Sequence, residues 1–382
     1  MFHVYNVDDY HAIHKIRRPD TVSTSTAKHF ATCVAKSITE SSFVPIIFNN
    51  ISIHNPSNVD AWRICWYLIN QYTGIFDISY LDNQQCWISQ RQLNTNEFDR
   101  VEALTVHIYN DNIIERKEER SMKGLQLVGF KEQHLHSVHD YVNILKLILS
   151  INEHLGQQVA PIVADWPGQI FIRKALYTDT LSREIESFLP MLGPLHLSLN
   201  SREQVLLVHH SFFENLFHFV FGNRKKLAKK PRPWRINLLL DLAQNGWIKI
   251  KKQIMEKFGQ TCKDIEYRTI IDLLDNLIPA TLDIYAILFR SGSFNEYVET
   301  VFRIWTFFLR WKRKNYNKAP LIFLSDLFYW KDNNHPFYDV IKKYLPNFND
   351  YYVENTHSRI RANTSPNATA DNIIKQAYVL SK

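Results

Sequence analysis

The strongest constraint on how this chain can fold is a change in its hydrophobic pattern near residue 200. Before that point, short runs of β-forming residues are interspersed with helix-like segments, whereas residues 202–345 show apolar spacings typical of helices almost throughout. A chain divided in this way is expected to form a mixed α/β part and an all-helical part. Its 382 residues suffice for a large core, either as one domain with a substantial insertion or as two domains in contact.

The first 200 residues contain a series of elements that can be predicted from β-propensity and periodicity. They are, in order, a strand at 2–7 ending at Asp8–Asp9, a buried strand at 44–48, a hairpin of 104–111 with 125–132, a helix at 137–156 and a strand at 159–165. Strand, hairpin, helix and strand is the opening order of an RNase H-like fold. In that fold the first and fourth strands are neighbours and their ends lie side by side.

The fold class predicted from this order is α/β, with an RNase H-like mixed sheet interrupted by a large all-helical insertion. Three segments follow from it. Residues 1–200 form the first part of the core, with 20–103 open as a further insertion, residues 201–345 form the helical insertion, and residues 346–382 return to the core. The returning segment contains the helix-compatible YYVENTHSRIRAN, bracketed by Pro346 and Pro366, and ends on the short helix ADNIIKQAYVL.

Composition favours a folded chain with polyanionic partners. Hydrophobic residues make up 45%, and 45 lysines and arginines against 38 acids give a net charge of +7, a mild preference for polyanions. The four cysteines are scattered, which is typical of a reducing compartment. We expect an intracellular protein without a membrane span, because the N-terminus lacks the pattern of a secretion signal and Arg303 and Arg310 interrupt the apolar run VFRIWTFFLRW.

Three acids occupy positions at which a metal centre could form. Asp8, or its neighbour Asp9, ends the first predicted strand, Asp165 ends the fourth, and Glu354 lies on the late predicted helix. Cleavage and transfer of phosphodiesters use hard divalent cations, and magnesium prefers oxygen ligands, so converging carboxylates suit this chemistry. The alternative for each acid alone is a solvated carboxylate or a helix cap.

Five stretches of the chain together resemble transposase-derived proteins of cut-and-paste DNA elements, similar in layout to hAT-type enzymes. They are NVDDYHAIH, PIVADWPGQ, MLGPLHLSLN, KAPLIFLSDLFYW and VENTHSRIRAN, and they span nearly the whole chain. The resemblance implies that Asp8, Asp165 and Glu354 are the catalytic positions, that Mg²⁺ or Mn²⁺ is the cofactor, and that DNA in the nucleus is the partner. Such proteins also carry a DNA-binding module upstream of these segments, and we expect none within the 382 residues.

One spacing departs from the family layout. The interval from Asp8 to Asp165 is longer than a compact core needs. Either residues 20–103 are a further insertion, or the first acid is Asp77 or Asp82 in IFDISYLDN.

Several cationic side chains are candidates for binding nucleic acid. Beside Glu354, the i, i+3, i+7 spacing places His357 and Arg361 near one helix face, where they could orient a phosphate or form an ordinary exposed polar face. Two further basic clusters are candidates. The first is a nuclear import signal, a phosphate-binding patch or a solvated loop. In the second, the interleaved aromatic residues stack on unpaired bases or belong to the core. The two clusters are Arg224, Lys225, Lys226, Lys229, Lys230, Arg232 and Arg235, and then Arg310, Lys312, Arg313 and Lys314 around Trp311.

Histidines elsewhere are given structural roles. His196 in GPLHLSLN lies on a strand-like segment and is interpreted as a hydrogen-bonded structural histidine. The segment HLHSVH (134–139) resembles a metal cluster, but its spacing matches no strong zinc pattern and it stands at a predicted helix start, so it is rejected as a metal site.

Two hypotheses from different functional classes remain. The first is a magnesium-dependent DNA nuclease and strand-transferase. The second is a catalytically inactive, transposase-derived module that binds nucleic acid or a protein, and self-association is open in both. Convergence of Asp8 or Asp9, Asp165 and Glu354 on one point would favour the first hypothesis.

Overall fold

The computed structural model divides the chain into two compact units. One, the sheet unit, comprises residues 1–57, 121–194 and 326–382, and the other, the helical unit, comprises residues 58–120 and 195–325. The structure describes residues 2–14, 26–41, 43–76, 116–151, 158–178, 185–259, 261–365 and 368–381. The predicted strand at 104–111, with Asp77 and Asp82, lies outside the described residues.

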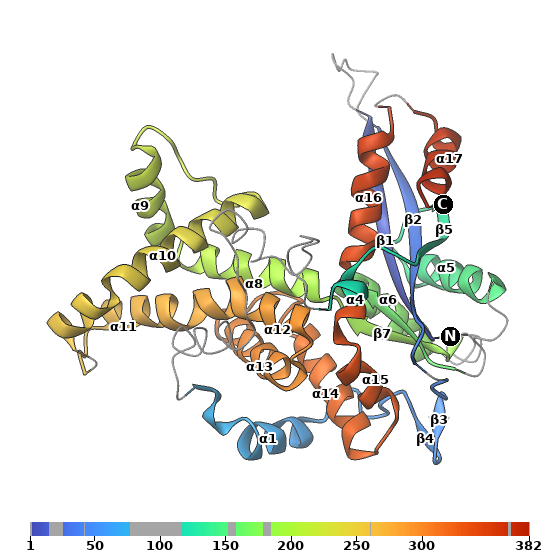
Figure 1. Cartoon of the computed structure of the whole chain (residues 1–382), viewed down its shortest axis with the longest axis horizontal. Coiled ribbons are helices and arrows are strands. Elements are labelled where there is room, and N and C mark those ends of the chain that lie inside the picture. The colour runs from blue at the N-terminus through green and yellow to red at the C-terminus, as the bar shows by residue number, and fades with distance from the viewer. Residues whose placement is uncertain are drawn as a thin grey trace. The chain divides into compact units, whose positions relative to one another are not determined.

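The sheet unit is built on a five-stranded mixed sheet (Figure 1). Its strands are β1 (Phe2–His14), β2 (Thr26–Ile38), β5 (Leu125–Glu132), β6 (Ala160–Ala164) and β7 (Phe188–Leu192), in the spatial order β5-β2-β1-β6-β7. β1, β2 and β5 pair antiparallel, whereas β1, β6 and β7 pair parallel. The predicted α/β class with a mixed sheet is therefore confirmed.

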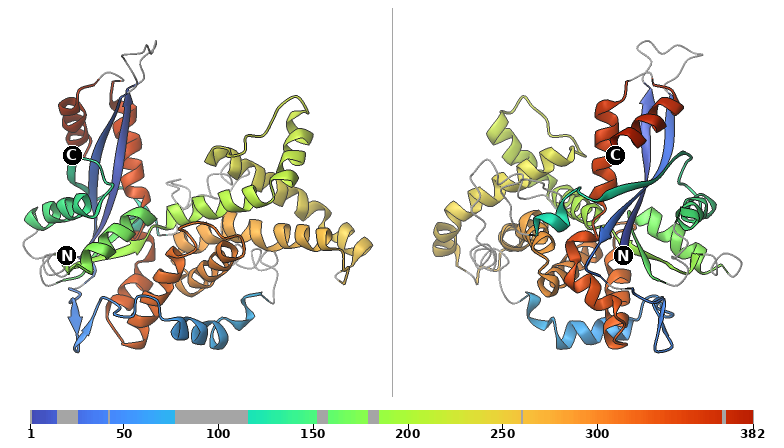
Figure 2. Two further views of the ribbon diagram at one scale, coloured as in Figure 1. Left: turned by 180° about the vertical axis from the view of Figure 1, so that it is seen from behind. Right: turned by 45° about the vertical axis from the view of Figure 1, so that its right-hand side comes forward.

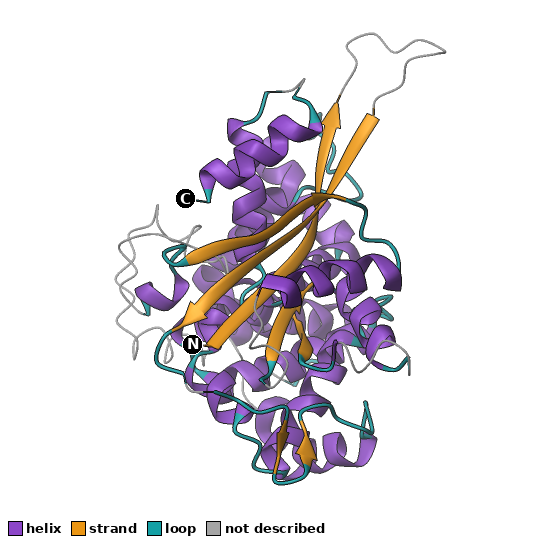
Figure 3. Cartoon of the chain, turned by 90° about the vertical axis from the view of Figure 1, so that its right-hand side faces the viewer, coloured by secondary structure: helices purple, strands orange, loops and turns teal. Residues whose placement is uncertain are grey.

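Helices cover both faces of this sheet (Figure 3). On one face, α5 (Val138–Ile151) and α6 (Trp166–Leu176) form a buried core with Tyr5 and Val7 of β1. On the other face, α16 (Tyr351–Asn363) and α17 (Ala370–Leu380) pack on Tyr10 and on Phe30 of β2. In both views of Figure 2, α16 lies along the long β1–β2 strands. The helices predicted near 137–156, at 350–362 and at the C-terminus are confirmed.

Two strands differ from the sequence-based expectation. β1 does not end at Asp8–Asp9 but continues to His14, because it pairs with β2 along its whole length. β2 was not predicted, since TAKHFATCVAKSI is rich in alanine and lysine, which have weak β-propensity. Pairing on both sides, with β1 and β5, makes it a strand of the main sheet instead of part of an insertion.

The predicted strand at 44–48 is much shorter in the structure. Only Ile47–Phe48 (β3) is a strand, and it pairs with Ile51–Ser52 (β4). This small hairpin is tied to the end of α14 (Ala319–Asp332), since Trp330 Nε1 donates to the carbonyl oxygen of Ile53 at 2.7 Å and Tyr329 donates to that of Ser52 at 3.0 Å.

The regular elements between residues 202 and 345 are all helical where the structure describes them, as predicted. The helical unit contains α1 (Ala61–Asn70), η1 (Thr73–Phe76), α4 (Lys117–Arg120), α8 (Pro194–Val208), α9 (His210–Phe221), α10 (Pro233–Phe258), α11 (Ile265–Asp272), η3 (Leu273–Leu277), η4 (Ala280–Ile284), α12 (Tyr285–Ser291) and α13 (Phe294–Arg310). After α14, the chain forms α15 (Phe337–Lys343) and η5 (Leu345–Asn347). The strand expected around His196 is wrong, because Pro194 starts α8 directly after Gly193.

A widened stretch of helix is stabilised by a buried arginine. η3 and η4 are π-helical turns on either side of Pro279, which has no N–H to continue an α-helical ladder. The guanidinium of Arg202, 2% exposed, donates to the carbonyl oxygens of Thr281 and Leu282 at 3.0 and 2.5 Å. This contact fastens α8 to the widened stretch inside the helical unit.

Gly193 allows a close approach at one edge of the sheet. Its N–H donates to the carbonyl oxygen of Ala164 at 3.1 Å, directly after β6 and β7. A Cβ atom built on Gly193 would overlap the carboxylate of Asp350, which is 1% exposed and immediately precedes α16. Because both neighbours are buried, only glycine fits between the sheet edge and the start of α16.

This packing leads to a prediction with a matched control. Gly193→Ala should lower the free energy of unfolding by about 1–3 kcal/mol, because the new methyl group must displace Asp350. Gly246→Ala should instead be neutral or stabilising by up to about 1 kcal/mol, since Gly246 lies within α10 and a Cβ there meets nothing within 4 Å. Urea unfolding of the two variants measures the difference, and equal stability of both would contradict the assigned packing.

Candidate metal centre

The parallel pairing of β1 with β6 brings two of the predicted acids to the same place in the sheet. Tyr5 pairs with Ile162 and Asn6 with Val163. Asp8 lies two residues beyond this pairing on β1, and Asp165 directly follows β6 as the N-cap of α6. Because neighbouring strands are about 4.8 Å apart, the two acids lie toward the same end of this strand pair. The expectation that the first and fourth predicted strands are neighbours is thereby confirmed.

The alternation of side chains along β1 separates Asp8 from Asp9. Tyr5 and Val7 belong to the core beneath α5 and α6, whereas Tyr10 packs against α16 and α17. Since successive side chains of a strand point to opposite faces, Asp8 shares the face of Tyr10 and Asp9 the face of Val7. Of the two alternatives that the sequence leaves open, only Asp8 lies on the face that carries Glu354.

Asp8, Glu354 and His357 form a group with metal-ligand geometry. One ligand atom of each lies within 4.8 Å of one of each of the others. The i, i+3 spacing on α16 turns Glu354 and His357 toward β1 together, as predicted. Arg361, the next residue of this face, lies with its guanidinium carbon 5.4 Å from the centroid of the Tyr10 ring. The three α16 side chains named in the sequence analysis therefore do share one face.

Asp165 is not a member of this group, and its side chain has a structural role. Its carboxylate caps α6 by accepting the N–H of Gly168 at 2.8 Å. Burial raises the pKa of the Tyr141 phenol, and the negative charges of Asp165, Asp8, Asp9 and Asp140 raise it further.

His357 is buried and neutral. It is 2% exposed, and burial, followed by the charge of Arg361, lowers its pKa to about 3. Its Nε2 lies 2.9 Å from Oγ1 of Thr32. The hydroxyl of Thr32 itself donates to the carbonyl oxygen of Phe30 at 3.3 Å. Thr32 therefore accepts from Nε2–H, and Nδ1 carries the lone pair. His357 therefore does not belong to an exposed polar helix face, which was the alternative for this residue.

A second group with metal-ligand geometry lies on the opposite face. Asp9, His29, His134 and His136 each place one ligand atom within 4.8 Å of the others. Taken alone, HLHSVH is not expected to bind metal, because its internal spacing fits no zinc pattern. Two of its histidines meet a third from β2, far away in the sequence. The sequence signal for this group is the alternation His134-Leu135-His136. Only the strand pairing shows that Asp9 and His29 join it.

The two basic clusters differ in their surroundings. From 224 to 235 the seven cations are exposed, except for half-buried Arg235. In the second cluster, Arg310 forms an ion pair with Asp272 at 2.9 Å, and Arg313 pairs with Glu203 and donates to Asn200 at 2.7 Å. Arg310 and Arg313 are thus engaged within the helical unit.

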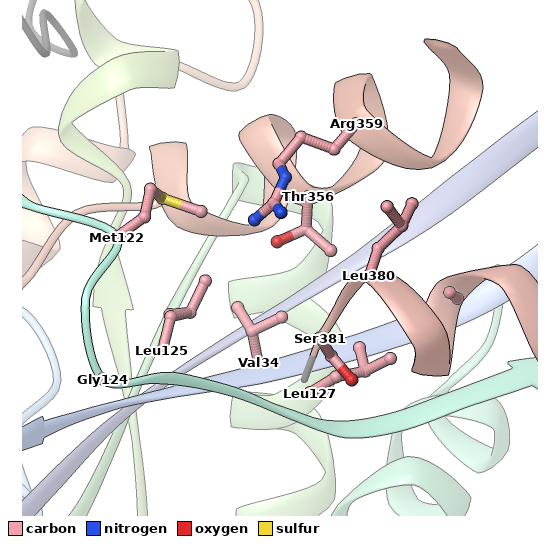
Figure 4. A pocket seen from close by; sticks show the side chains of 10 residues that line it. Val34, Met122, Gly124, Leu125, Leu127, Thr356, Arg359, Leu380 and Ser381 are labelled. Carbon is pink, nitrogen blue, oxygen red and sulfur yellow. The ribbon is translucent and has the colours of Figure 1, made fainter. Parts of the chain in front are cut away.

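A pocket of about 250 Å³ lies on another side of α16 (Figure 4). It is lined from α16 by Thr356 and Arg359, which helical periodicity turns away from Glu354. Val34 of β2 and Leu380 at the end of α17 also line this pocket, as Figure 4 shows. None of the three predicted acids lines it, so it is separate from the metal centre.

Comparisons with protein-family models, with curated proteins and with solved structures found no match. Among the described residues, none of the helices combines the length and the apolar character that crossing a membrane requires. A functional assignment therefore depends on the residues of the site themselves.

The Thr32–His357 contact can be tested by substitution. Thr32→Val should lower the free energy of unfolding by about 1–3 kcal/mol, because the buried Nε2–H of His357 loses its acceptor. Thr32→Ser keeps the acceptor oxygen and should lose much less. Urea unfolding followed by tryptophan fluorescence measures both, and a loss in Thr32→Ser as large as or larger than that in Thr32→Val would contradict the assigned role of the hydrogen bond.

Proposed function

We propose that this chain is a divalent-metal-dependent DNA phosphodiesterase and strand-transferase of the transposase type. One observation carries the proposal, namely that Glu354 of α16 meets Asp8 of β1, the strand that pairs in parallel with β6, which Asp165 directly follows. Three carboxylates from three distant segments are thus carried by neighbouring elements of the sheet unit. This is the arrangement that phosphoryl transfer with hard cations needs.

The topology supports an RNase H-like core with a helical insertion. In the main sheet, the first strand in chain order, β1, is the neighbour of the fourth, β6, in the order β5-β2-β1-β6-β7. The chain leaves the sheet unit after β7, forms helices of the helical unit, and returns before α16. Glu354 is then carried by the first long helix after the return, which matches the layout of hAT-type transposases.

The residues present suit Mg²⁺ or Mn²⁺. Asp8, Asp165 and Glu354 offer carboxylate oxygens, the ligands that hard cations prefer, and would hold the ion or ions. When bound, such ions neutralise charge on the attacking and leaving oxygens of the phosphodiester. The neutral ring of His357 adds no positive charge beside them, so the carboxylates retain their full attraction for cations.

Other contacts of the site position its groups. The buried Thr32–His357 hydrogen bond fixes the register of α16 on the sheet, and hence the place of Glu354. Arg361 is exposed on the same helix face, over the Tyr10 ring, where its guanidinium can bind the phosphate to be cleaved. Phosphoryl transfer depends largely on such positioning and charge.

The sharpest prediction concerns Glu354. Glu354→Gln keeps the shape of the side chain but removes the charge that attracts a hard cation, so metal-dependent DNA cleavage should fall by several orders of magnitude. Asp8→Asn and Asp165→Asn should have the same effect, and double variants should be little worse than single ones, because the acids act as a unit. Cleavage of labelled DNA in Mg²⁺ or Mn²⁺ measures this.

Asp371→Asn serves as the matched control. It neutralises an exposed acid in the first turn of α17, away from the three acids, and should leave cleavage unchanged. DNA binding without metal should survive in every variant. If the wild-type chain cleaves DNA and Glu354→Gln cleaves equally well, the three acids are assigned incorrectly.

DNA binding should depend mainly on the exposed cluster at 224–235. Replacing Lys225, Lys226, Lys229 and Lys230 by glutamine should weaken binding and flatten the plot of log affinity against log salt by about 0.9 per lost duplex phosphate contact. Arg310→Gln should change the slope little, because Arg310 is already paired with Asp272. Fluorescence anisotropy at several salt concentrations gives both slopes, and an unchanged slope in the lysine variant would identify this cluster as ordinary solvated surface.

A further inference from the structure

Three imidazoles and one carboxylate gather on the face of the sheet opposite Glu354. Asp9 Oδ2 lies 3.0 Å from Nδ1 of His29, and the rings of His29 and His134 stack with centroids 3.4 Å apart. The ring of His136 lies 4.9 Å from that of His134. A fourth histidine, His11, flanks the group with its Nε2 3.7 Å from Asp9 Oδ2.

The segment that carries His134 and His136 is held at both ends. On one side, the N–H of Gln133 donates to the carbonyl oxygen of His29 at 3.0 Å. On the other side, the carboxylate of Asp140 accepts the N–H groups of His136 and Ser137 at 3.2 and 2.9 Å, which caps the start of α5. The two histidines are therefore placed before any ligand arrives.

The residue between them fixes their direction. Leu135 is 4% exposed and packs into the core beneath α5 and α6, whereas His134 and His136 are exposed. In an extended segment, residues i and i+2 point to one side. Burial of Leu135 thus turns both imidazoles outward together, toward His29 and Asp9.

We propose that Asp9, His29, His134 and His136 bind a divalent transition metal of the zinc type. Three imidazole nitrogens and one carboxylate oxygen form a donor set that suits zinc and disfavours magnesium, which prefers oxygen ligands alone. Ligand atoms about 2.0–2.2 Å from a tetrahedral zinc ion are roughly 3.3–3.6 Å apart. The present spread, within 4.8 Å, would contract to that spacing as the exposed side chains of His134 and His136 rotate.

Binding there would connect three parts of the sheet unit. The ligands come from β1, from β2 and from the link between β5 and α5, so one ion would hold the β1–β2 hairpin to the start of α5. Zinc should then stabilise the folded chain by an amount that grows with the logarithm of its affinity. The proposal does not depend on the proposed function, because the site shares no ligand with Asp8, Asp165 and Glu354.

The test is zinc binding by the full chain after treatment with a chelator. Excess Mg²⁺ is present throughout to occupy the carboxylate site, and a chromophoric chelator competes for Zn²⁺. We expect one zinc ion per chain and a rise in Tm on adding it. His134→Ala and His136→Ala should each lower zinc affinity by more than the roughly 10–100-fold caused by losing an outer-shell partner, and the double variant should lose the Tm shift.

Two controls separate this site from others. His139→Ala removes an exposed histidine of the same segment that lies outside the group, and it should retain zinc binding and the Tm shift. Glu354→Gln should retain both as well. The proposal is overturned if the wild-type chain binds no zinc, if the double variant binds it as tightly as the wild type, or if Glu354→Gln alone abolishes binding.

Discussion

Strand β1 carries two carboxylates in succession, and the pleat of the strand sends them to opposite faces of the sheet. Asp8 meets Glu354 and His357 of α16, while Asp9 meets three histidines on the other face. Backbone geometry alone imposes this division, since neighbouring side chains of a strand cannot share a face. A shift of one residue in the pairing of β1 would exchange the two acids and dismantle both groups.

The Asp8 face then depends on how α16 is held against the sheet. Three buried contacts fix it at different points: the carboxylate of Asp350 against Gly193 at its start, the His357–Thr32 hydrogen bond in its middle, and Ile360 in the core with Tyr10. Buried polar groups are costly unless they are paired, so these contacts select one register of the helix. Glu354 reaches Asp8 as a consequence of that register.

Charge pairing separates cations that can meet a ligand from cations that serve the fold. Arg202 is buried on backbone carbonyl oxygens, and Arg310 and Arg313 are paired with acids, whereas the cations between 224 and 230 are exposed. Arg310 and Arg313 look like the cations between 224 and 230 in the sequence, as members of runs of lysine and arginine. Their roles differ because acids and carbonyl groups distant in the chain reach some of them and not others.

Local patterns determined the mixed class, the helices α5, α16 and α17, the strand β6 and the helical face shared by Glu354, His357 and Arg361. These features depend on residues within a few positions of one another, so periodicity and propensity suffice to predict them. Tertiary structure alone decided that the weak β-former TAKHFATCVAKSI is β2, that β1 continues beyond Asp9, and that His29 joins His134 and His136. Each of these results depends on pairing between segments far apart in the chain, whose energy comes from hydrogen bonds and burial that no short stretch of sequence contains.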